Sequence, residues 1–183
     1  MPTSVAGLFE AAKPQHGLFR RCDAYSSGVS WKCLTTLVRN GVVEAVAQNV
    51  FRICGSPPTP DQSTLIAVWA GGSACWATQQ TAAVLHGFDV AKSGGPIHVV
   101  VTEAGRGYRR EGVRVHATSL VLPEDICIVR GIPCLDPIRT WLSLAASLPL
   151  FRLEEILDAA ERDGRIRRDD LLRRATDAAR CRI

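Results

Sequence analysis

A short run of basic, hydroxyl and aromatic side chains near the N-terminus has the chemistry needed to hold a nucleic acid. Lys32 and Arg39 can reach phosphates or guanine edges, and Thr35 and Thr36 can contact bases or thymine methyl groups. Trp31 belongs to the same run. The full set of candidate DNA-binding residues is Arg20, Arg21, Ser30, Trp31, Lys32, Thr35, Thr36, Arg39 and Arg52.

Two short helices are needed to position these residues. Ser30 is a good N-cap for a helix over 31–40, whose apolar face leaves most of the polar residues on the other side. A helix over about 20–27 precedes it and is closed by Gly28. Two short helices joined by a tight turn that contains glycine are typical of a helix-turn-helix, whose second helix enters the major groove.

A hairpin follows the second of these helices. The β-prone runs 42–46 and 50–53 flank a short turn, in which Asn49 tolerates a positive φ. A hairpin at this place is the wing of a winged helix-turn-helix, and Arg52 on it can add a phosphate contact. The alternative is a small helical bundle with a solvated polar face.

Charge and hydropathy restrict the class of protein. Residues 1–58 carry six Lys and Arg against three Asp and Glu, so most of the net charge of +4 lies there. Hydrophobic residues make up 46% of the chain, enough for a core, and no apolar run reaches the roughly 18–20 residues that span a bilayer. The first twelve residues lack the pattern of a signal peptide. We therefore expect a cytoplasmic protein without a membrane segment.

Cysteine usage fits the same compartment. The number of cysteines is odd and none forms a C-x-x-C pair, so buried reduced thiols are favoured over a disulfide scaffold or a zinc site. We expect no cofactor and no metal. The seven cysteines are Cys22, Cys33, Cys54, Cys75, Cys127, Cys134 and Cys181.

A proline-rich stretch at 56–60 predicts a boundary between two domains, 1–55 and 56–183. The expected class is α+β: an N-terminal winged helix-turn-helix followed by a mixed α/β domain with a small sheet and C-terminal helices. In the second domain, strands are expected at 97–102, 113–117 and 125–130, and helices at about 60–70, 79–86, 137–146, 151–163 and 168–180. In the first domain, the spacing of apolar residues also predicts a helix at 5–12. Thr59 with Gln62, Thr78 and Asp136 are expected to cap helices, residues 131–133 to end the third strand, and Leu172 to lie on an apolar face of the last helix.

Residues 105–110, between the first two of these strands, predict a hairpin loop with a basic tip. A solvated loop is the simpler interpretation, and contact with a nucleic acid is the alternative. The same segment lacks the third glycine of a nucleotide-binding fingerprint.

The histidines do not suggest catalysis. None has H-E-x-x-H spacing or adjoins a likely nucleophile, so we expect no catalytic residues and no enzyme. His86 is interpreted as a helix C-terminal cap. His98 and His116 are expected on neighbouring strands in a structural role, and Arg139 in a salt bridge or an interdomain contact.

Three stretches of the chain resemble the N-terminal half of the AbiEi-type antitoxins of bacterial type IV toxin–antitoxin systems. They are GLFRRCDAYSSGVS through VAQNVFRI (17–53), ATQQTAAVLHGF (77–88) and VRVHATSL through SLAA (113–146). The resemblance implies a winged helix joined to a mixed α/β domain. It also implies an antitoxin that represses its own operon by binding inverted repeats in double-stranded DNA, and that counteracts a nucleotidyltransferase-like toxin.

A second hypothesis comes from the same resemblance. Many relatives continue into a nuclease-like domain similar to very-short-patch repair endonucleases, and the helix over 31–40 carries fewer arginines than the resemblance implies. The alternative function is therefore a protein-interaction module, related to the N-terminal part of such a nuclease-like protein, with weak or no specific DNA binding.

Overall fold

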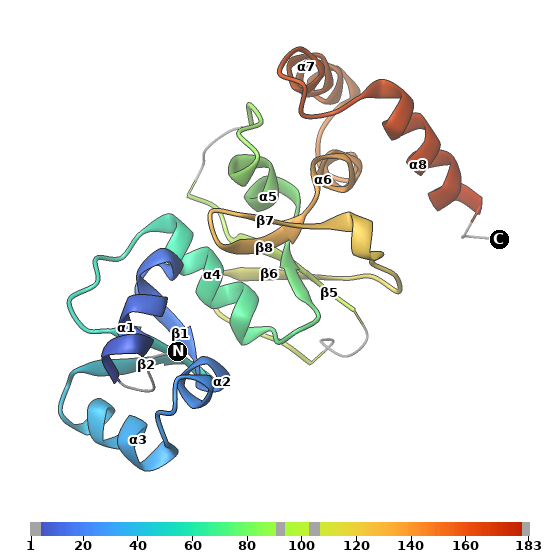
Figure 1. The fold of residues 1–183 in the computed structure, drawn as a ribbon. Coiled ribbons are helices and arrows are strands. Elements are labelled where there is room, and N and C mark those ends of the chain that lie inside the picture. The colour runs from blue at the N-terminus through green and yellow to red at the C-terminus, as the bar shows by residue number, and fades with distance from the viewer. Residues whose placement is uncertain (1–4, 91–93, 103–106, 181–183) are drawn as a thin grey trace.

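The computed structural model describes residues 5–90, 94–102 and 107–180, the last four of them as backbone only. Helices and two small β-sheets make up this part of the chain (Figure 1). The mixed α+β class expected from the sequence is correct at that level. Among the described residues, no helix combines the length and the apolar character of a membrane span.

The N-terminal part surrounds a three-stranded sheet in which β3 lies between β1 and β2 and pairs antiparallel with both. The rings of Phe19 and Phe51 stack with their centroids 5.6 Å apart, and Leu8 and Leu34 complete the core beside them. The elements are α1 (Val5–Ala12), η1 (Lys13–Gln15), β1 (Leu18–Arg20), α2 (Arg21–Ser26), α3 (Trp31–Arg39), β2 (Val43–Ala47) and β3 (Val50–Ile53). β1 was not predicted, because three residues are too few to show alternation.

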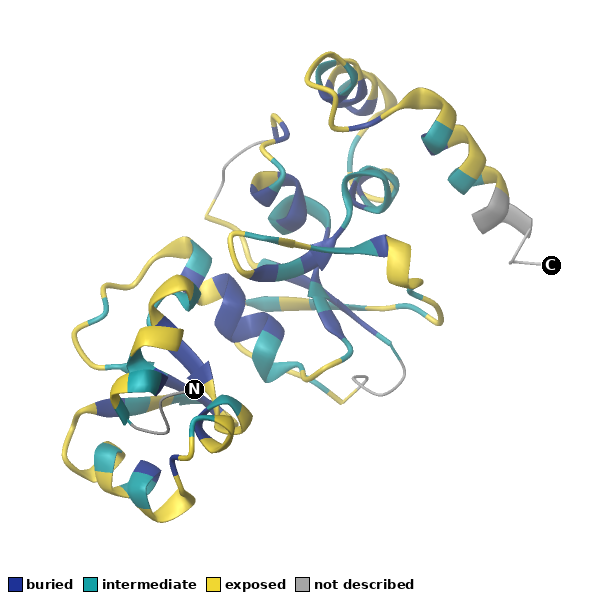
Figure 2. Cartoon of the chain, viewed as in Figure 1, coloured by how far each residue is buried: buried dark blue, intermediate teal, exposed yellow. Residues whose placement is uncertain are grey.

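Helix α4 (Pro60–Ala70) packs against both sheets (Figure 1). It begins as predicted, since the Oγ1 of Thr59 accepts the backbone N–H of Gln62 at 3.1 Å and proline takes the first helical position. The four residues from Leu65 to Val68 are all buried, so α4 is enclosed on several sides (Figure 2).

The two sheets share an apolar cluster through α4. Leu18 and Val50 of the smaller sheet pack with residues of α4 and of the larger sheet in one core. The predicted boundary at residues 55 and 56 thus coincides with a change of sheet, while the apolar packing continues across it.

The larger sheet has five strands in the order β6-β5-β4-β8-β7. Its strands are β4 (Cys75–Ala77), β5 (Ile97–Val101), β6 (Val113–Ala117), β7 (Ile126–Val129) and β8 (Ile132–Leu135). Sequence analysis missed β4 and β8. Gly131, which was expected to end the chain's third strand, instead forms with Arg130 the turn between β7 and β8, and both residues have positive φ.

The expected hairpin between residues 97–102 and 113–117 is wrong, because β5 and β6 run parallel. Their connection is therefore a crossover and not a tight turn. The apolar pattern of two strands does not encode their relative direction, and glycines in the connection favoured the hairpin. Residues 103–106 of this connection, which include Gly105 and Arg106 of the expected basic tip, lie outside the described residues.

A second core lies among the later helices, which form a layer beside the larger sheet and extend away from it (Figure 1). They are α5 (Gln79–Leu85), α6 (Pro137–Leu144), α7 (Leu150–Arg162) and α8 (Arg168–Arg180), with η3 (Pro123–Asp125) before β7. All four were predicted to within a few residues. Leu172, which was expected on an apolar face of the last helix, is 61% exposed instead.

Candidate nucleic-acid interface

The join between α2 and α3 is built by two local signals that the sequence predicted correctly. Gly28 has φ 77°, and the N–H groups of Gly28 and Val29 each donate to a carbonyl of α2 at 2.9 Å. This pair of bonds is the Schellman end of a helix. Ser30 then caps α3, since its Oγ accepts the N–H of Cys33 at 3.3 Å.

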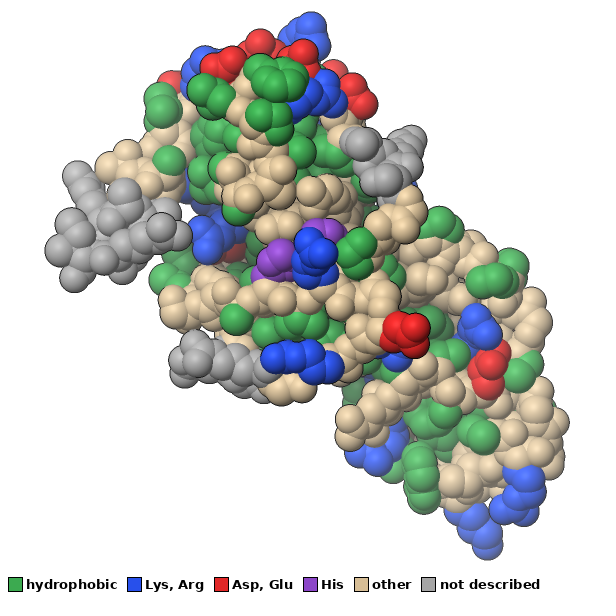
Figure 3. Space-filling view, turned by 180° about the vertical axis from the view of Figure 1, so that it is seen from behind, with side chains coloured by type: hydrophobic (Ala, Val, Ile, Leu, Met, Phe, Trp, Pro, Cys, Tyr) green, Lys and Arg blue, Asp and Glu red, His purple; other side chains and the backbone are tan. Residues whose placement is uncertain are grey.

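The outer face of α3 presents a charged and aromatic surface. Trp31, Lys32 and Arg39 are exposed, and Trp31 keeps 49% of its surface accessible. The guanidinium of Arg21, from the start of α2, lies over the Trp31 ring, 5.7 Å from its centroid. Figure 3 shows Lys and Arg side chains at the outer edge of the N-terminal part of the molecule.

The two threonines of α3 use their hydroxyl hydrogens within the helix. Oγ1 of Thr35 and Oγ1 of Thr36 each donate to the carbonyl of Lys32 at 2.9 Å. In this rotamer the threonines offer their methyl groups and an acceptor oxygen outward. Contact with a thymine methyl needs no change of rotamer, whereas donation to a base or a phosphate needs one.

Arg20 is paired within the chain, although its side chain stays 46% exposed. Its side chain donates to both carboxylate oxygens of Asp23 at 3.0 Å, and its guanidinium lies over the ring of Trp69, 4.9 Å from the centroid. The hydrogen bond to Asp23 raises the pKa of the Arg20 guanidinium. Arg20 therefore fixes the entry into α2 against α4.

Arg52 is engaged in the same way. Its Nε donates to Glu44 at 2.8 Å and its Nη1 donates to the Oε1 of Gln62 at 3.1 Å. Gln62 is buried and donates in turn to the carbonyl of His16 at 2.8 Å. The structure thus directs Arg52 toward α4, the helix that packs against both sheets. This pairing was not predicted, because Gln62 was interpreted only as part of a helix cap.

The hairpin β2–β3 has the tip that the sequence predicts. Asn49 has φ 59°, and Gln48 and Asn49 are exposed between the strands. The second part of the chain reaches this hairpin as well, because the Nη2 of Arg110 donates to the carbonyl of Val46 at 3.3 Å.

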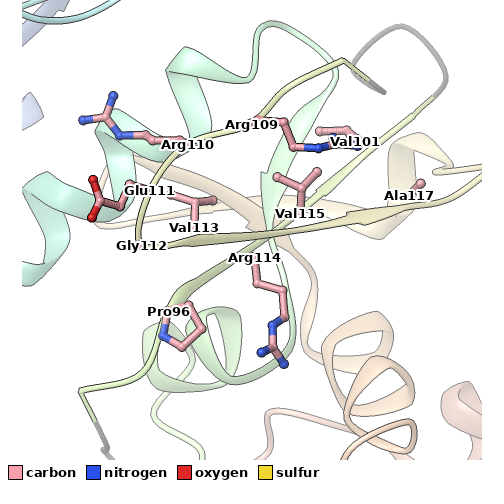
Figure 4. A pocket seen from close by; sticks show the side chains of 10 residues that line it. All are labelled: Pro96, Val101, Arg109, Arg110, Glu111, Gly112, Val113, Arg114, Val115 and Ala117. Carbon is pink, nitrogen blue, oxygen red and sulfur yellow. The ribbon is translucent and has the colours of Figure 1, made fainter.

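An open hollow of about 900 Å³ lies along β6 and the segment before it (Figure 4). Arg109 and Arg110 lie on the same side of β6 as Val113 and Val115, while Arg114 points to the other side (Figure 4). The hollow thus places the basic side chains of Arg109 and Arg110 beside the β2–β3 hairpin. They belong to the segment for which nucleic-acid contact was the alternative interpretation.

Three soft metal-ligand atoms meet elsewhere, between α5 and the β7–β8 hairpin. The thiols of Cys127 and Cys134 lie 3.5 Å apart, and Nε2 of His86 lies 4.0 Å from the Cys134 sulfur. Nε2 of His86 also lies 2.7 Å from the carbonyl oxygen of Leu135. His86 occupies the C-cap position of α5 as expected, but its ring turns away to this hairpin.

His98 and His116 lie on neighbouring strands, as predicted. Nδ1 of His98 is 3.0 Å from Nε2 of His116, and the two rings stack with centroids 5.2 Å apart. Burial lowers the pKa of both imidazoles, and the charge of the adjacent Arg114 lowers both further. One neutral ring donates to the other, so the pair stabilises the β5–β6 contact.

Comparison with known proteins identifies the second part of the chain. A family model, the AbiEi antitoxin C-terminal domain, matches residues 73–183. The chain belongs to the AbiEi antitoxin family. The match contains two of the three stretches from which the resemblance was inferred, and residues 17–53 lie before it. The matching model describes the family's C-terminal domain, whereas the resemblance inferred from the three stretches was to the N-terminal half of such antitoxins. A search of curated proteins finds no match.

In this AbiEi-family chain, Arg174 ties α8 to the larger sheet. Its guanidinium contacts the carboxylates of both Asp125 and Asp136. Asp136 is also the predicted N-cap of α6, and accepts the N–H of Arg139 at 2.7 Å. The salt bridge expected for Arg139 is present with its Nε 4.0 Å from Asp125. Arg174 was missed because its partners lie 38 and 49 residues away.

The α5 helix of this AbiEi-family chain is capped from a distant helix. Thr78 stands at the N-cap position, as predicted, but its side chain makes no cap bond. The Oγ of Ser143, in α6, accepts the N–H of Gln79 at 3.2 Å instead. The expected cap is therefore wrong in the residue that supplies the acceptor oxygen, because the packing of α6 on α5 brings a competing hydroxyl to the same place.

Proposed function

We propose that this AbiEi-family protein is a cytoplasmic, non-enzymatic DNA-binding autorepressor and the antitoxin of a type IV toxin–antitoxin system. In this proposal α1–α3 with the sheet β1–β3 form a winged helix-turn-helix over 1–55, and residues 56–183 form the antitoxin domain. Family membership supports the antitoxin role, and the order helix, helix, helix, hairpin supports the winged helix.

The exposed face of α3 carries the DNA-binding half of the proposal. Lys32 and Arg39 are exposed cations at the two ends of this helix, and the Arg21–Trp31 pair holds a third cation beside it. In the proposed complex α3 lies in the major groove, these cations contact phosphates or guanine edges, and Thr36 presents its methyl group to a base.

Arg20 and Arg52 have a different part in the proposal. Their guanidinium groups are already paired with Asp23 and Glu44, and they touch α4 through Trp69 and Gln62. We propose that they orient the DNA-binding part on the antitoxin part, and that they contribute less to phosphate binding than Arg21, Lys32 and Arg39.

Fluorescence anisotropy with the DNA upstream of the protein's own gene tests the proposal. Each phosphate contact lowers the slope of log affinity against log salt by about 0.9, so three cations predict a slope of about −3 per bound protomer. Arg39→Ala is expected to make this slope less steep by about 1, that is, to bring it to about −2. Lys13→Ala, which also removes one exposed cation of the N-terminal part but lies outside α2 and α3, is the matched control and is expected to leave the slope unchanged.

The alternative, a protein-interaction module, predicts another result. Its supporting observation is the pairing of Arg20 and Arg52 within the chain, which leaves few cations for phosphate. The module predicts weak affinity that is equal for all DNA sequences and that changes equally in Arg39→Ala and Lys13→Ala. This result would contradict the specific repressor. Rescue of growth on co-expression with an adjacent nucleotidyltransferase-like gene tests the antitoxin half independently of DNA.

A further inference from the structure

The β7–β8 hairpin places two thiols side by side against one imidazole. Cys127 and Cys134 are direct partners in the antiparallel register, so their side chains leave the same face of the hairpin. His86, at the end of α5, approaches from outside the hairpin, as Figure 1 shows for α5 beside β7 and β8. The donor atoms of all three side chains lie within 4.8 Å of one another.

We propose that His86, Cys127 and Cys134 form a binding site for a thiophilic divalent cation, with Zn²⁺ as the cation that it fits best. Two thiolates and one imidazole are the ligands that zinc prefers, and a fourth, non-protein ligand such as water completes the tetrahedron. The family match does not imply a cation of this kind. The site could not be predicted from spacing along the chain, because 41 and 48 residues separate His86 from the two cysteines.

The distances are near those around a tetrahedral ion. With zinc–sulfur bonds of about 2.3 Å and a zinc–nitrogen bond of about 2.0 Å, two sulfurs lie about 3.8 Å apart, and a sulfur and a nitrogen about 3.5 Å. The observed separations are 3.5 Å between the sulfurs and 4.0 Å between the Cys134 sulfur and Nε2 of His86. All three donor atoms lie within 4.8 Å of one another, and rotation of the side chains brings them to the separations of a tetrahedral site.

The surroundings of the site stay satisfied when a cation binds. The thiolate is the form of cysteine that binds metals, and binding of the cation releases the thiol protons. Binding releases Nε2 of His86 from the carbonyl of Leu135. That carbonyl keeps a partner, because Oγ1 of Thr140 donates to it at 3.0 Å. Loss of this one bond to His86 therefore leaves no buried group unpaired.

The position of the site indicates what the cation does. It joins the end of α5 to the β7–β8 hairpin, within the segment that matches the antitoxin domain. Cys134 belongs to the core around the larger sheet, and Phe88, two residues after His86, belongs to the core of the later helices. A bound ion therefore holds the two cores of the second part together.

Optical titration of the full chain with Co²⁺, after reduction with a phosphine, tests this site. The expected result is one equivalent of bound Co²⁺ with a thiolate-to-cobalt charge-transfer band and tetrahedral d–d bands, all removed by Zn²⁺. His86→Ala and Cys127→Ala are expected to weaken binding by at least about 100-fold. Cys33→Ala, a half-buried cysteine outside the cluster, is the matched control and is expected to bind as the unsubstituted chain does.

Alkylation of the unsubstituted chain gives a readout that does not depend on a variant's folding. One equivalent of Zn²⁺ is expected to slow alkylation of Cys127 at least about tenfold and to leave the exposed Cys22 and Cys54 unaffected. Equal alkylation of Cys127 with and without Zn²⁺ would overturn the proposal. So would the absence of a charge-transfer band in the reduced chain, or a band that survives in Cys127→Ala and disappears in Cys33→Ala.

Discussion

The guanidinium of Arg21 lies over the indole ring of Trp31, 5.7 Å from the ring centroid, and so joins the first turn of α2 to the first turn of α3. The indole is 49% exposed, and it holds a cation at the end of the helix proposed to enter DNA. The pair is therefore the most direct place to test that face.

Trp31→Ala is expected to weaken specific DNA binding about fivefold, because it removes a cation–π contact of about 1 kcal/mol and frees Arg21. Stability is expected to change little, since Trp31 is 49% exposed. Anisotropy titration and thermal unfolding measure the two effects. Phe151→Ala, which removes an aromatic ring that is 60% exposed in α7, is the control and is expected to leave DNA affinity intact.

Ser143→Ala is expected to lower the free energy of unfolding by about 1–2 kcal/mol, because the N–H of Gln79 loses its acceptor at the start of α5. Urea denaturation measures the effect. Ser147→Ala removes a nearby hydroxyl that donates to the carbonyl of Leu144 and accepts an exposed hydrogen bond from the side chain of Gln80. It leaves no backbone N–H without its acceptor, so it is expected to cost clearly less. Equal losses from the two substitutions would show that the cap is supplied otherwise.

Arg174→Met is expected to destabilise the chain by about 1–3 kcal/mol. It leaves the carboxylates of Asp125 and Asp136, which are 9% and 14% exposed, without the cation between them. The neighbouring Arg173→Met is the matched control, because Arg173 is 68% exposed and pairs with Asp170 of the same helix. Its loss is expected to stay within about 0.5 kcal/mol. Similar values for both variants, again from urea denaturation, would contradict the role assigned to Arg174.

The pair His98 and His116 is expected to make stability fall in mild acid. Burial lowers the pKa of both rings in the folded chain, whereas the unfolded chain protonates near pH 6.5. As the pH falls through 6.5 the unfolded state takes up protons first, so the free energy of unfolding decreases until the folded pKa values are passed. Above about pH 7.5 both states are almost fully neutral and the pair adds little pH dependence.

Urea denaturation between pH 7.5 and 5 measures this effect as a difference between chains. The double variant His98→Gln, His116→Gln is expected to show a smaller loss of stability over that interval than the unsubstituted chain. Other groups of the protein titrate equally in both chains, so identical slopes would refute the assignment.

Much of the N-terminal part follows from short-range signals. The left-handed Gly28 and Asn49, the hydroxyl of Ser30 and the apolar spacing of the first helix act over three or four residues, and each was predicted where it is found. The later helices were also predicted, because amphipathic spacing repeats over two or more turns.

Short strands were harder to predict. The strands β1 and β4 have three residues each, too few for alternation to stand out from a loop. β8 was hidden by Pro133, which was interpreted as the end of a strand. These elements exist because neighbouring strands supply their hydrogen bonds, and such support is not visible in the residues themselves.

The sequence by itself determined the helices, most of their caps, the hairpin tip and the family, because those depend on neighbours along the chain or on a pattern of residues. Only the tertiary structure decided that Ser143 caps α5, that β5 and β6 run parallel, that Arg20 and Arg52 pair within the chain, and that His86 meets two cysteines. Each of the latter depends on which distant segments share a core. Backbone propensity and apolar spacing do not specify that choice, since burial rewards any partner of suitable shape.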